Sequence, residues 1–141
     1  MPKKEKKDKA IETAKRTLGK EIAKCRKELS QRKLASAVGL PPSNMKYIED
    51  GVNAPSPEIY KKLIQVLHPE EKHRKKMDHL YMLIRKVPPP DVCEIMIRNE
   101  EINDAMRMIE GQTLTDIQIG NVKSLFTSFI ANNDKGVAGN G

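Results

Sequence analysis

The chain has 141 residues, of which 38% are hydrophobic and 32% are charged, and its formal net charge is +7. Three Tyr, two Phe and no Trp are too few aromatic side chains for the stacking platforms that bind RNA or single-stranded nucleic acid. The two cysteines, Cys25 and Cys93, form no Cys-x-x-Cys motif, which argues against a zinc ribbon or a thioredoxin-like redox site.

The charge is unevenly distributed along the chain. Residues 1–87 contain 22 Lys/Arg and 11 Asp/Glu, a net charge of +11, whereas residues 88–141 contain 4 and 8, a net charge of −4. A basic N-terminal part is typical of proteins with a polyanionic partner, although a Lys-rich soluble surface has the same composition. No apolar run reaches the about 20 residues of a membrane span, and MPKKEKKDKA lacks the apolar centre of a signal peptide. We therefore expect a cytoplasmic protein that has no membrane partner.

Residues 1–16 are rich in Lys, Glu and Asp, and we expect a basic N-terminal tail there, either a frayed helix or disordered. Glu5, Asp8 and Glu12 dilute its positive charge, which favours a solubilising role over contacts with phosphates. The following segment, LGKEIAKCRKEL, places apolar residues at spacings of four, three and four, which predicts an amphipathic helix. The residues of this apolar stripe are Leu18, Ile22, Cys25 and Leu29.

The stretch SQRKLASAVGLPPSNMKYIEDG predicts two short helices. Ser30 is a typical N-cap of the first helix, and Gly39 can adopt the left-handed conformation that ends it. Pro41 and Pro42 suit only the first turn of a helix and therefore mark the start of the second. The predicted buried residues of the pair are Leu34, Ala35, Val38, Met45 and Ile48.

Two longer helices follow. Ser56 caps the first, which begins at Pro57, and the second runs from Pro69 to about Lys86. Their apolar residues recur at helical spacing and are expected to complete the core of the same domain. These residues are Ile59, Leu63, Val66, Leu67, Met77, Leu80, Tyr81 and Ile84.

The segment VPPPD breaks the helical pattern because three prolines cannot lie inside a helix, and we place a domain boundary between residues 87 and 88. Beyond it, residues 88–131 again have helical patterns, and residues 132–141 resemble a disordered tail. No segment alternates convincingly with a period of two. The sequence therefore predicts an all-α protein with a domain at 17–87 and a smaller helical segment at 88–131.

Residues 18–67 resemble the Cro/CI-type helix-turn-helix domain of the XRE family. The resemblance runs through Leu18, Ile22 and Arg26, then SQRKLASAVGL, then Met45, Ile48, Glu49 and Gly51, then Pro55 and Ser56. It implies a five-helix, lambda-repressor-like domain that binds double-stranded DNA with the second helix of the pair in the major groove. The implied function is a sequence-specific transcriptional regulator, a repressor that acts as a dimer on a palindromic operator.

The resemblance also assigns individual residues to DNA. They are Gln31, which should contact a phosphate, and Arg32, Ser43, Asn44, Lys46, Tyr47 and Asn53. Asn44 can form paired hydrogen bonds with adenine, and Tyr47 offers both a hydroxyl group and an apolar ring to a base. Glu49, which the family shares, is expected to hold Arg26 or nearby backbone, because an acid near phosphates is repelled.

Two features depart from the family pattern. Pro41 and Pro42 replace polar residues, and the loop Val52–Ala54 lacks the Lys or Arg that often contacts the DNA backbone. We expect the basic N-terminus or the Lys72–Lys76 cluster to supply phosphate contacts instead.

The sequence indicates no catalytic, metal or cofactor site. His68, His73 and His79 are spaced five and six residues apart, so they do not share a helix face, and no Cys lies near them. Gly-rich phosphate loops and Gly-x-Ser-x-Gly motifs are absent. We therefore expect a protein that is not an enzyme.

The C-terminal segment is where we expect dimerisation, because one helix-turn-helix domain reads too few base pairs for useful specificity. The predicted oligomerisation residues are Val122, Leu125, Phe126, Phe129 and Ile130. Alternatively, these residues pack on helices of their own chain, since any amphipathic stripe must be buried somewhere. A second function is also open: an antitoxin-type or other interaction protein whose acidic C-terminal helices bind a protein partner.

Overall fold

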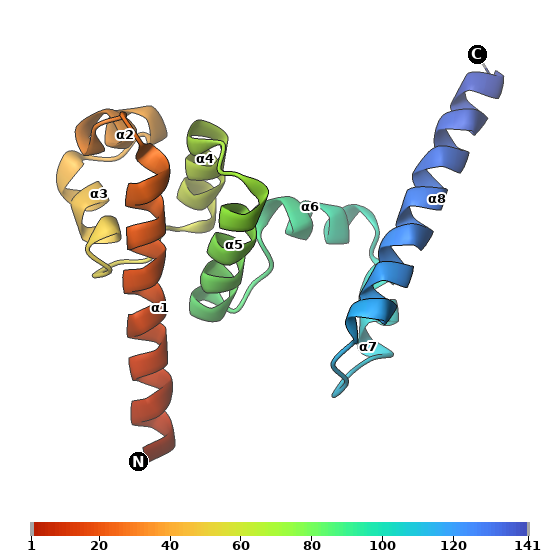
Figure 1. The fold of residues 1–141 in the computed structure, drawn as a ribbon, viewed down its shortest axis with the longest axis horizontal. Coiled ribbons are helices and arrows are strands. Elements are labelled where there is room, and N and C mark those ends of the chain that lie inside the picture. Colours follow the sequence, from red (N-terminus) through yellow and green to blue (C-terminus); the bar gives the residue numbers. More distant parts are fainter. Residues whose placement is uncertain (1, 141) are drawn as a thin grey trace. The chain divides into compact units, whose positions relative to one another are not determined.

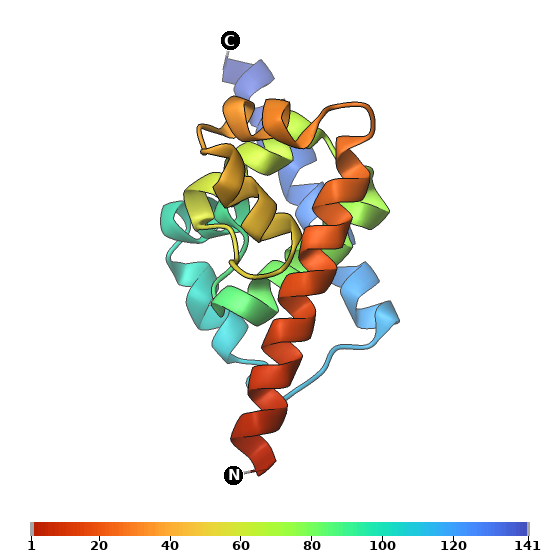
Figure 2. The ribbon, with the colours of Figure 1, turned by 90° about the vertical axis from the view of Figure 1, so that its left-hand side faces the viewer.

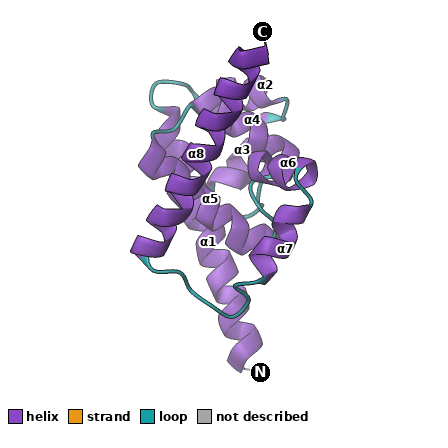
Figure 3. Cartoon of the chain, turned by 90° about the vertical axis from the view of Figure 1, so that its right-hand side faces the viewer, coloured by secondary structure: helices purple, strands orange, loops and turns teal. Residues whose placement is uncertain are grey.

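The computed structural model describes the backbone of residues 2–140 and the side chains of residues 3–134. The described chain contains eight helices and no strand (Figures 1 and 3), so the protein is all-α, as predicted. The helices are α1 (Pro2–Arg26), α2 (Gln31–Val38), α3 (Pro42–Glu49), α4 (Pro57–Leu67), α5 (Glu71–Arg85), α6 (Pro90–Arg98), α7 (Glu101–Arg107) and α8 (Asp116–Asn140). They form two compact units, Met1–Asn99 and Glu100–Gly141. None of the described helices has the length and apolarity needed to cross a membrane.

The core of the first unit is built around α1. Leu18 and Ile22 of α1 are buried against apolar residues from α2, α3, α4 and α5. The buried residues of these four helices are Leu34, Ala35, Val38, Met45, Ile48, Tyr60, Leu63, Met77, Leu80 and Tyr81. Fully burying one large side chain stabilises a fold by roughly 1.5–3 kcal/mol, so this shared core explains how helices as short as α2 and α3 persist.

A buried carboxylate fixes α1 to α5, which packs on the side of α1 away from α3 (Figures 1 and 2). Glu21 is 3% exposed, and its Oε1 lies 3.3 Å from Lys76 Nζ and 3.6 Å from His73 Nδ1. Burial alone would raise the pKa of Glu21, but Lys76, Lys24 and His73 outweigh it and hold the pKa below its ordinary value. The ionised carboxylate therefore ties the two helices together.

The N-terminal segment is helical, which is one of the two forms expected for this tail. α1 begins at Pro2 and is continuous to Arg26, and Ala14 lies in the core with 5% exposure. Lys, Glu and Ala are strong helix formers, so a high density of charge does not prevent a helix here. Residues 3–10 form the exposed N-terminal part of this helix.

The boundaries around the proline-rich segment also differ from prediction. The first unit extends to Asn99 because α6 packs on α4 and makes two ion pairs with the preceding helices. Lys61 Nζ lies 2.7 Å from Glu94 Oε1, and Arg74 Nη2 lies 3.0 Å from Asp91 Oδ2. The prolines start α6 rather than separate two domains.

The second unit contains α7 and α8. None of its described residues, 100–134, is buried. α8 begins with a capping box, in which Thr115 Oγ1 accepts from the Gln118 backbone N–H at 3.2 Å and Gln118 Oε1 accepts from the Thr115 N–H at 2.9 Å. The helix runs to Asn140, so the predicted disordered tail at 132–141 is helical through residue 140, and residue 141 lies outside the described part.

The five predicted oligomerisation residues all lie exposed on α8. Their exposed fractions range from 38% to 63%. These residues are Val122, Leu125, Phe126, Phe129 and Ile130.

Candidate nucleic-acid interface

The α2–α3 pair is defined by local signals at its ends. Ser30 Oγ accepts a hydrogen bond from the Lys33 backbone N–H at 3.1 Å, which caps α2. Gly39 has a φ of +78°, the left-handed conformation that ends α2, and α3 begins at Pro42. The predicted limits of α2 and the predicted start of α3 are therefore confirmed.

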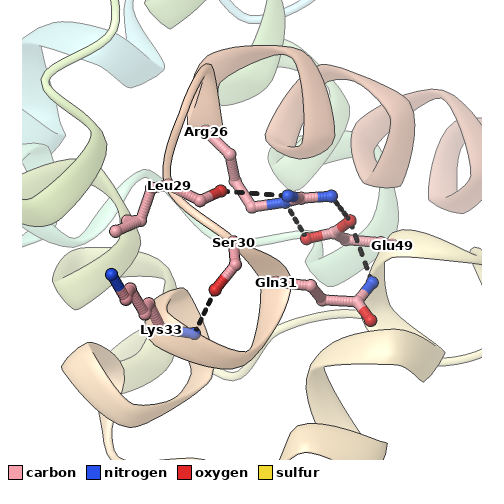
Figure 4. Close-up of polar contacts among 6 residues, drawn as sticks. All are labelled: Arg26, Leu29, Ser30, Gln31, Lys33 and Glu49. Carbon is pink, nitrogen blue, oxygen red and sulfur yellow. Dashed lines mark hydrogen bonds and ion pairs between the residues drawn. The ribbon is translucent and has the colours of Figure 1, made fainter.

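A carboxylate at the end of α3 joins α1, α2 and α3 (Figure 4). The side chain of Glu49 is 5% exposed and accepts two hydrogen bonds from Arg26, from Nε at 2.8 Å and from Nη2 at 2.9 Å. Gln31 Nε2 donates to the same carboxylate at 3.0 Å, and Arg26 Nη1 donates to the Leu29 carbonyl at 3.0 Å. The predicted role of Glu49 in holding Arg26 is confirmed. Gln31, expected on a phosphate, has its amide group oriented by Glu49.

Two glycines bring the backbones of α1 and α3 into direct contact. A Cβ added to Gly19 would lie 2.6 Å from the Ile48 carbonyl oxygen. A Cβ added to Gly51, which has a φ of +80°, would lie 2.6 Å from Cα of Arg16. Both positions therefore require glycine, and together they fix the distance between α3 and α1.

One face of α3 is exposed. Ser43, Lys46, Tyr47 and Asp50 recur at spacings of three, one and three residues and all lie exposed. Met45 and Ile48 are buried on the opposite face. The exposed face carries two hydroxyl groups, one cation and one anion, so it can donate and accept hydrogen bonds but has no net charge.

The cation and the anion of this face are paired with each other. Lys46 Nζ lies 2.7 Å from Asp50 Oδ2, one helical turn away. The hydrogen bond and the charge of Asp50 raise the pKa of Lys46. Because both groups are exposed, the pair contributes little to stability, but it does neutralise a charge that a phosphate could otherwise use.

Asn44 and Asn53 lie at the flank of this face and line a cleft of about 560 Å³. The cleft lies between α1, α3, the loop that leads to α4, the start of α4 and the C-terminal end of α5. Arg85 of α5 fixes this loop by donating from Nη2 to the Ala54 carbonyl at 2.8 Å and from Nε to the Pro55 carbonyl at 3.1 Å. Both asparagines are exposed beside the α3 face. The loop next to Asn53 is held in place by the hydrogen bonds from Arg85.

The N-terminus of α3 offers a single backbone donor. Pro41 and Pro42 have no N–H, and the N–H of Asn44 donates to the Pro41 carbonyl at 3.0 Å. The N–H of Ser43 has no backbone acceptor within the described residues. One phosphate oxygen can therefore be bound here by backbone, fewer than the several donors of an ordinary helix start.

The two predicted sources of phosphate contacts differ in structure. In the Lys72–Lys76 cluster, Lys76 pairs with Glu21, Arg74 pairs with Asp91, and Lys75 Nζ lies 3.1 Å from Glu71 Oε1. This cluster is on α5, on the other side of α1 from α3 (Figure 1). By contrast, the lysines of the exposed N-terminal part of α1 and Arg32 of α2 form no ion pair with any described residue. These lysines are Lys3, Lys4, Lys6, Lys7 and Lys9.

Gly19 and Asp50 were not identified by the sequence patterns. Gly19 stands beside Leu18 inside a helical pattern, where an isolated glycine often has a packing reason. Asp50 stands four residues after Lys46, the spacing of a favourable pair on one helix face. Both signals are present in the sequence.

Comparisons with family models, with curated proteins and with solved structures found no match to this chain.

Proposed function

We propose that the protein is a sequence-specific regulator of transcription that binds double-stranded DNA, with α3 in the major groove. The observation that carries the proposal is the exposed face of α3, which presents Ser43, Lys46 and Tyr47 while its other side is buried. The major groove of B-DNA, about 12 Å wide, admits one helix, and its base edges are read by hydroxyl and cationic side chains of this kind.

The charge of the first unit supports the same proposal. Residues 1–99 contain 23 Lys/Arg and 13 Asp/Glu, a net charge of +10, against −3 for residues 100–141. Such an imbalance attracts a polyanion and gives binding that weakens with salt. The unpaired lysines of the exposed part of α1, together with Arg32, are the phosphate contacts that the proposal requires.

Selection of bound duplexes from a random DNA library tests the proposal. The wild type should enrich a two-fold symmetric motif, and Ser43→Ala/Tyr47→Ala should lose it while still binding DNA weakly through its lysines. The matched control is Gln65→Ala on the exposed surface of α4, which should enrich the same motif as the wild type. A wild type that binds without sequence preference would show that α3 does not read bases.

Asp50→Asn is expected to increase DNA affinity by about 3–10-fold at low salt, because it removes an anion from the α3 face and releases Lys46. If Lys46 then neutralises one more phosphate, the slope of log K against log salt becomes steeper by about 0.9. Fluorescence anisotropy with the selected duplex between 50 and 200 mM salt, roughly the range over which such slopes are resolved, measures both quantities.

The control for this prediction is Asp104→Asn, which breaks an exposed pair with Arg107 in the second unit. It changes the net charge by the same amount and should leave affinity and slope close to the wild-type values. An Asp50→Asn protein that binds like the control would place Lys46 outside the interface.

A second candidate function is that of an interaction protein whose C-terminal helices bind a different protein. The observation that favours it is the exposed apolar surface of α8 in a unit of which none of the described residues, 100–134, is buried. This function requires no base readout, so the library selection separates it from the first proposal.

A further inference from the structure

The exposed apolar residues of α8 have the spacing of a coiled coil. Ile119, Val122, Phe126 and Phe129 recur at three, four and three residues, and Asn133 continues the pattern four residues later. These are alternating a and d positions of the heptad repeat. All five lie exposed along one uninterrupted helix.

No residue between 100 and 134, the part of the second unit whose side chains the structure describes, covers this stripe. No residue of 100–134 is buried, and the rings of Phe126 and Phe129 lie with their centroids 6.2 Å apart on one continuous apolar surface. A unit of this size without a core does not bury enough surface to be stable alone. The stripe therefore needs a partner surface of similar length.

We propose that α8 pairs with α8 of a second copy of this chain as a parallel, in-register, two-stranded coiled coil. The residues that flank the a/d stripe favour this partner and this direction. In a parallel pair each g position faces the following e position of the other helix, which sets Leu125 against Ile130 of the partner subunit and Gln118 against the partner subunit's Lys123. The contact between Leu125 and Ile130 of the partner subunit would widen the apolar interface beyond the a and d positions.

The opposite direction is disfavoured by the same residues. In an antiparallel pair e positions face e positions, so Lys123 would lie against the apolar side chain at 130. Asn133 occupies an a position, where an asparagine that meets its own copy in register selects the parallel two-stranded form. Antiparallel pairing would place this amide against a different residue and leave its hydrogen bonds unsatisfied.

The charge of the helix suits an identical partner. Lys123 is the only charged residue between Ile117 and Asn133, and it lies outside the a and d positions. Two identical helices therefore meet without like charges at their interface. A protein partner selected by charge would find little on this face to recognise.

The heptad stripe is short, so we expect weak dimerisation. Ile119 to Asn133 is a length of about 20 Å at a rise of about 1.5 Å per residue, near the lower limit for a stable helix pair. We expect a reversible monomer–dimer equilibrium at micromolar concentration. This inference does not depend on DNA binding, so it stands or falls separately from the proposed function.

Sedimentation equilibrium of the full chain tests the pairing. Phe126→Asp places a charge at an a position and should weaken dimerisation by at least about 100-fold. The matched control, Thr127→Asp, adds the same charge at the next, exposed residue off the stripe and should dimerise like the wild type. A wild type that stays monomeric, or equal dimerisation of the two variants, would overturn the proposal.

Oxidative cross-linking tests the direction. In a Cys25→Ser/Cys93→Ser background, Asn133→Cys should form disulfide-linked dimers, since the two thiols would meet in register. Ser128→Cys, off the stripe, is the control and should remain unlinked. Antiparallel pairing is indicated if Asn133→Cys links only to a separately prepared Val122→Cys protein, because an a position then faces a d position, and that result would overturn the parallel arrangement.

Discussion

Gly19→Ala is expected to lower the free energy of unfolding of the first unit by about 3 kcal/mol, the upper end of overpacking costs. The added Cβ would lie 2.6 Å from the Ile48 carbonyl oxygen and closer still to that of Glu49. These are backbone atoms of α3, which cannot rotate away as a flexible side chain can. α1 and α3 must therefore move apart. Because the core between them is tightly packed, this movement breaks contacts between their buried side chains.

Gly120→Ala is the matched control, since Gly120 is also a helical glycine but has nothing within 4 Å of its added Cβ. Alanine is the better helix former, so this variant should be unchanged or more stable by up to about 1 kcal/mol. Urea denaturation followed by circular dichroism compares the two. Equal midpoints for Gly19→Ala and the wild type would mean that the close approach of α1 and α3 does not exist in solution.

Glu49→Ala is expected to cost about 3–5 kcal/mol, because it leaves the Arg26 guanidinium partly buried without its carboxylate. It also removes the acceptor of the Gln31 side chain. The same denaturation experiment measures the effect. The loss should appear as a lower midpoint, and the proposed function further requires weaker sequence-specific DNA binding, because Glu49 ends α3.

The comparison is Glu58→Ala, which removes an exposed carboxylate 3.5 Å from Lys62 Nζ and should cost less than about 1 kcal/mol. A double-mutant cycle of Arg26→Ala and Glu49→Ala then measures the interaction free energy between these two side chains. Its two single changes should not add, since each already breaks the same bidentate contact. Additive effects would assign the loss to helix packing and not to the ion pair.

The α2–α3 pair was predictable because its ends are determined locally. Ser30, Gly39 and Pro42 act through their own backbone and nearest neighbours, and those effects are visible in sequence. The apolar stripes were predictable for the same reason, since burial follows helical spacing. The assignment of Glu49 to Arg26 came from the family resemblance, and the structure has the contact.

Other features depend on contacts between distant segments. Tyr60 is buried because it stacks on Tyr81 at 4.2 Å and donates from its hydroxyl to Asp78 at 2.6 Å, partners that no local pattern reveals. α6 joins the first unit through the ion pairs Lys61–Glu94 and Arg74–Asp91, whereas the prolines before it suggested a boundary. The cleft at Asn44 likewise forms where α1, α3, the loop before α4 and the end of α5 converge.

The two prolines at the start of α3 have a thermodynamic consequence. Pro41 and Pro42 fix two φ angles before any partner arrives, and Arg26 and Gln31 immobilise the other end of the helix through Glu49. A preorganised element loses little conformational entropy on binding. The heat capacity change of complex formation should then report the surface buried at the interface itself, without the added contribution of a segment that folds on contact.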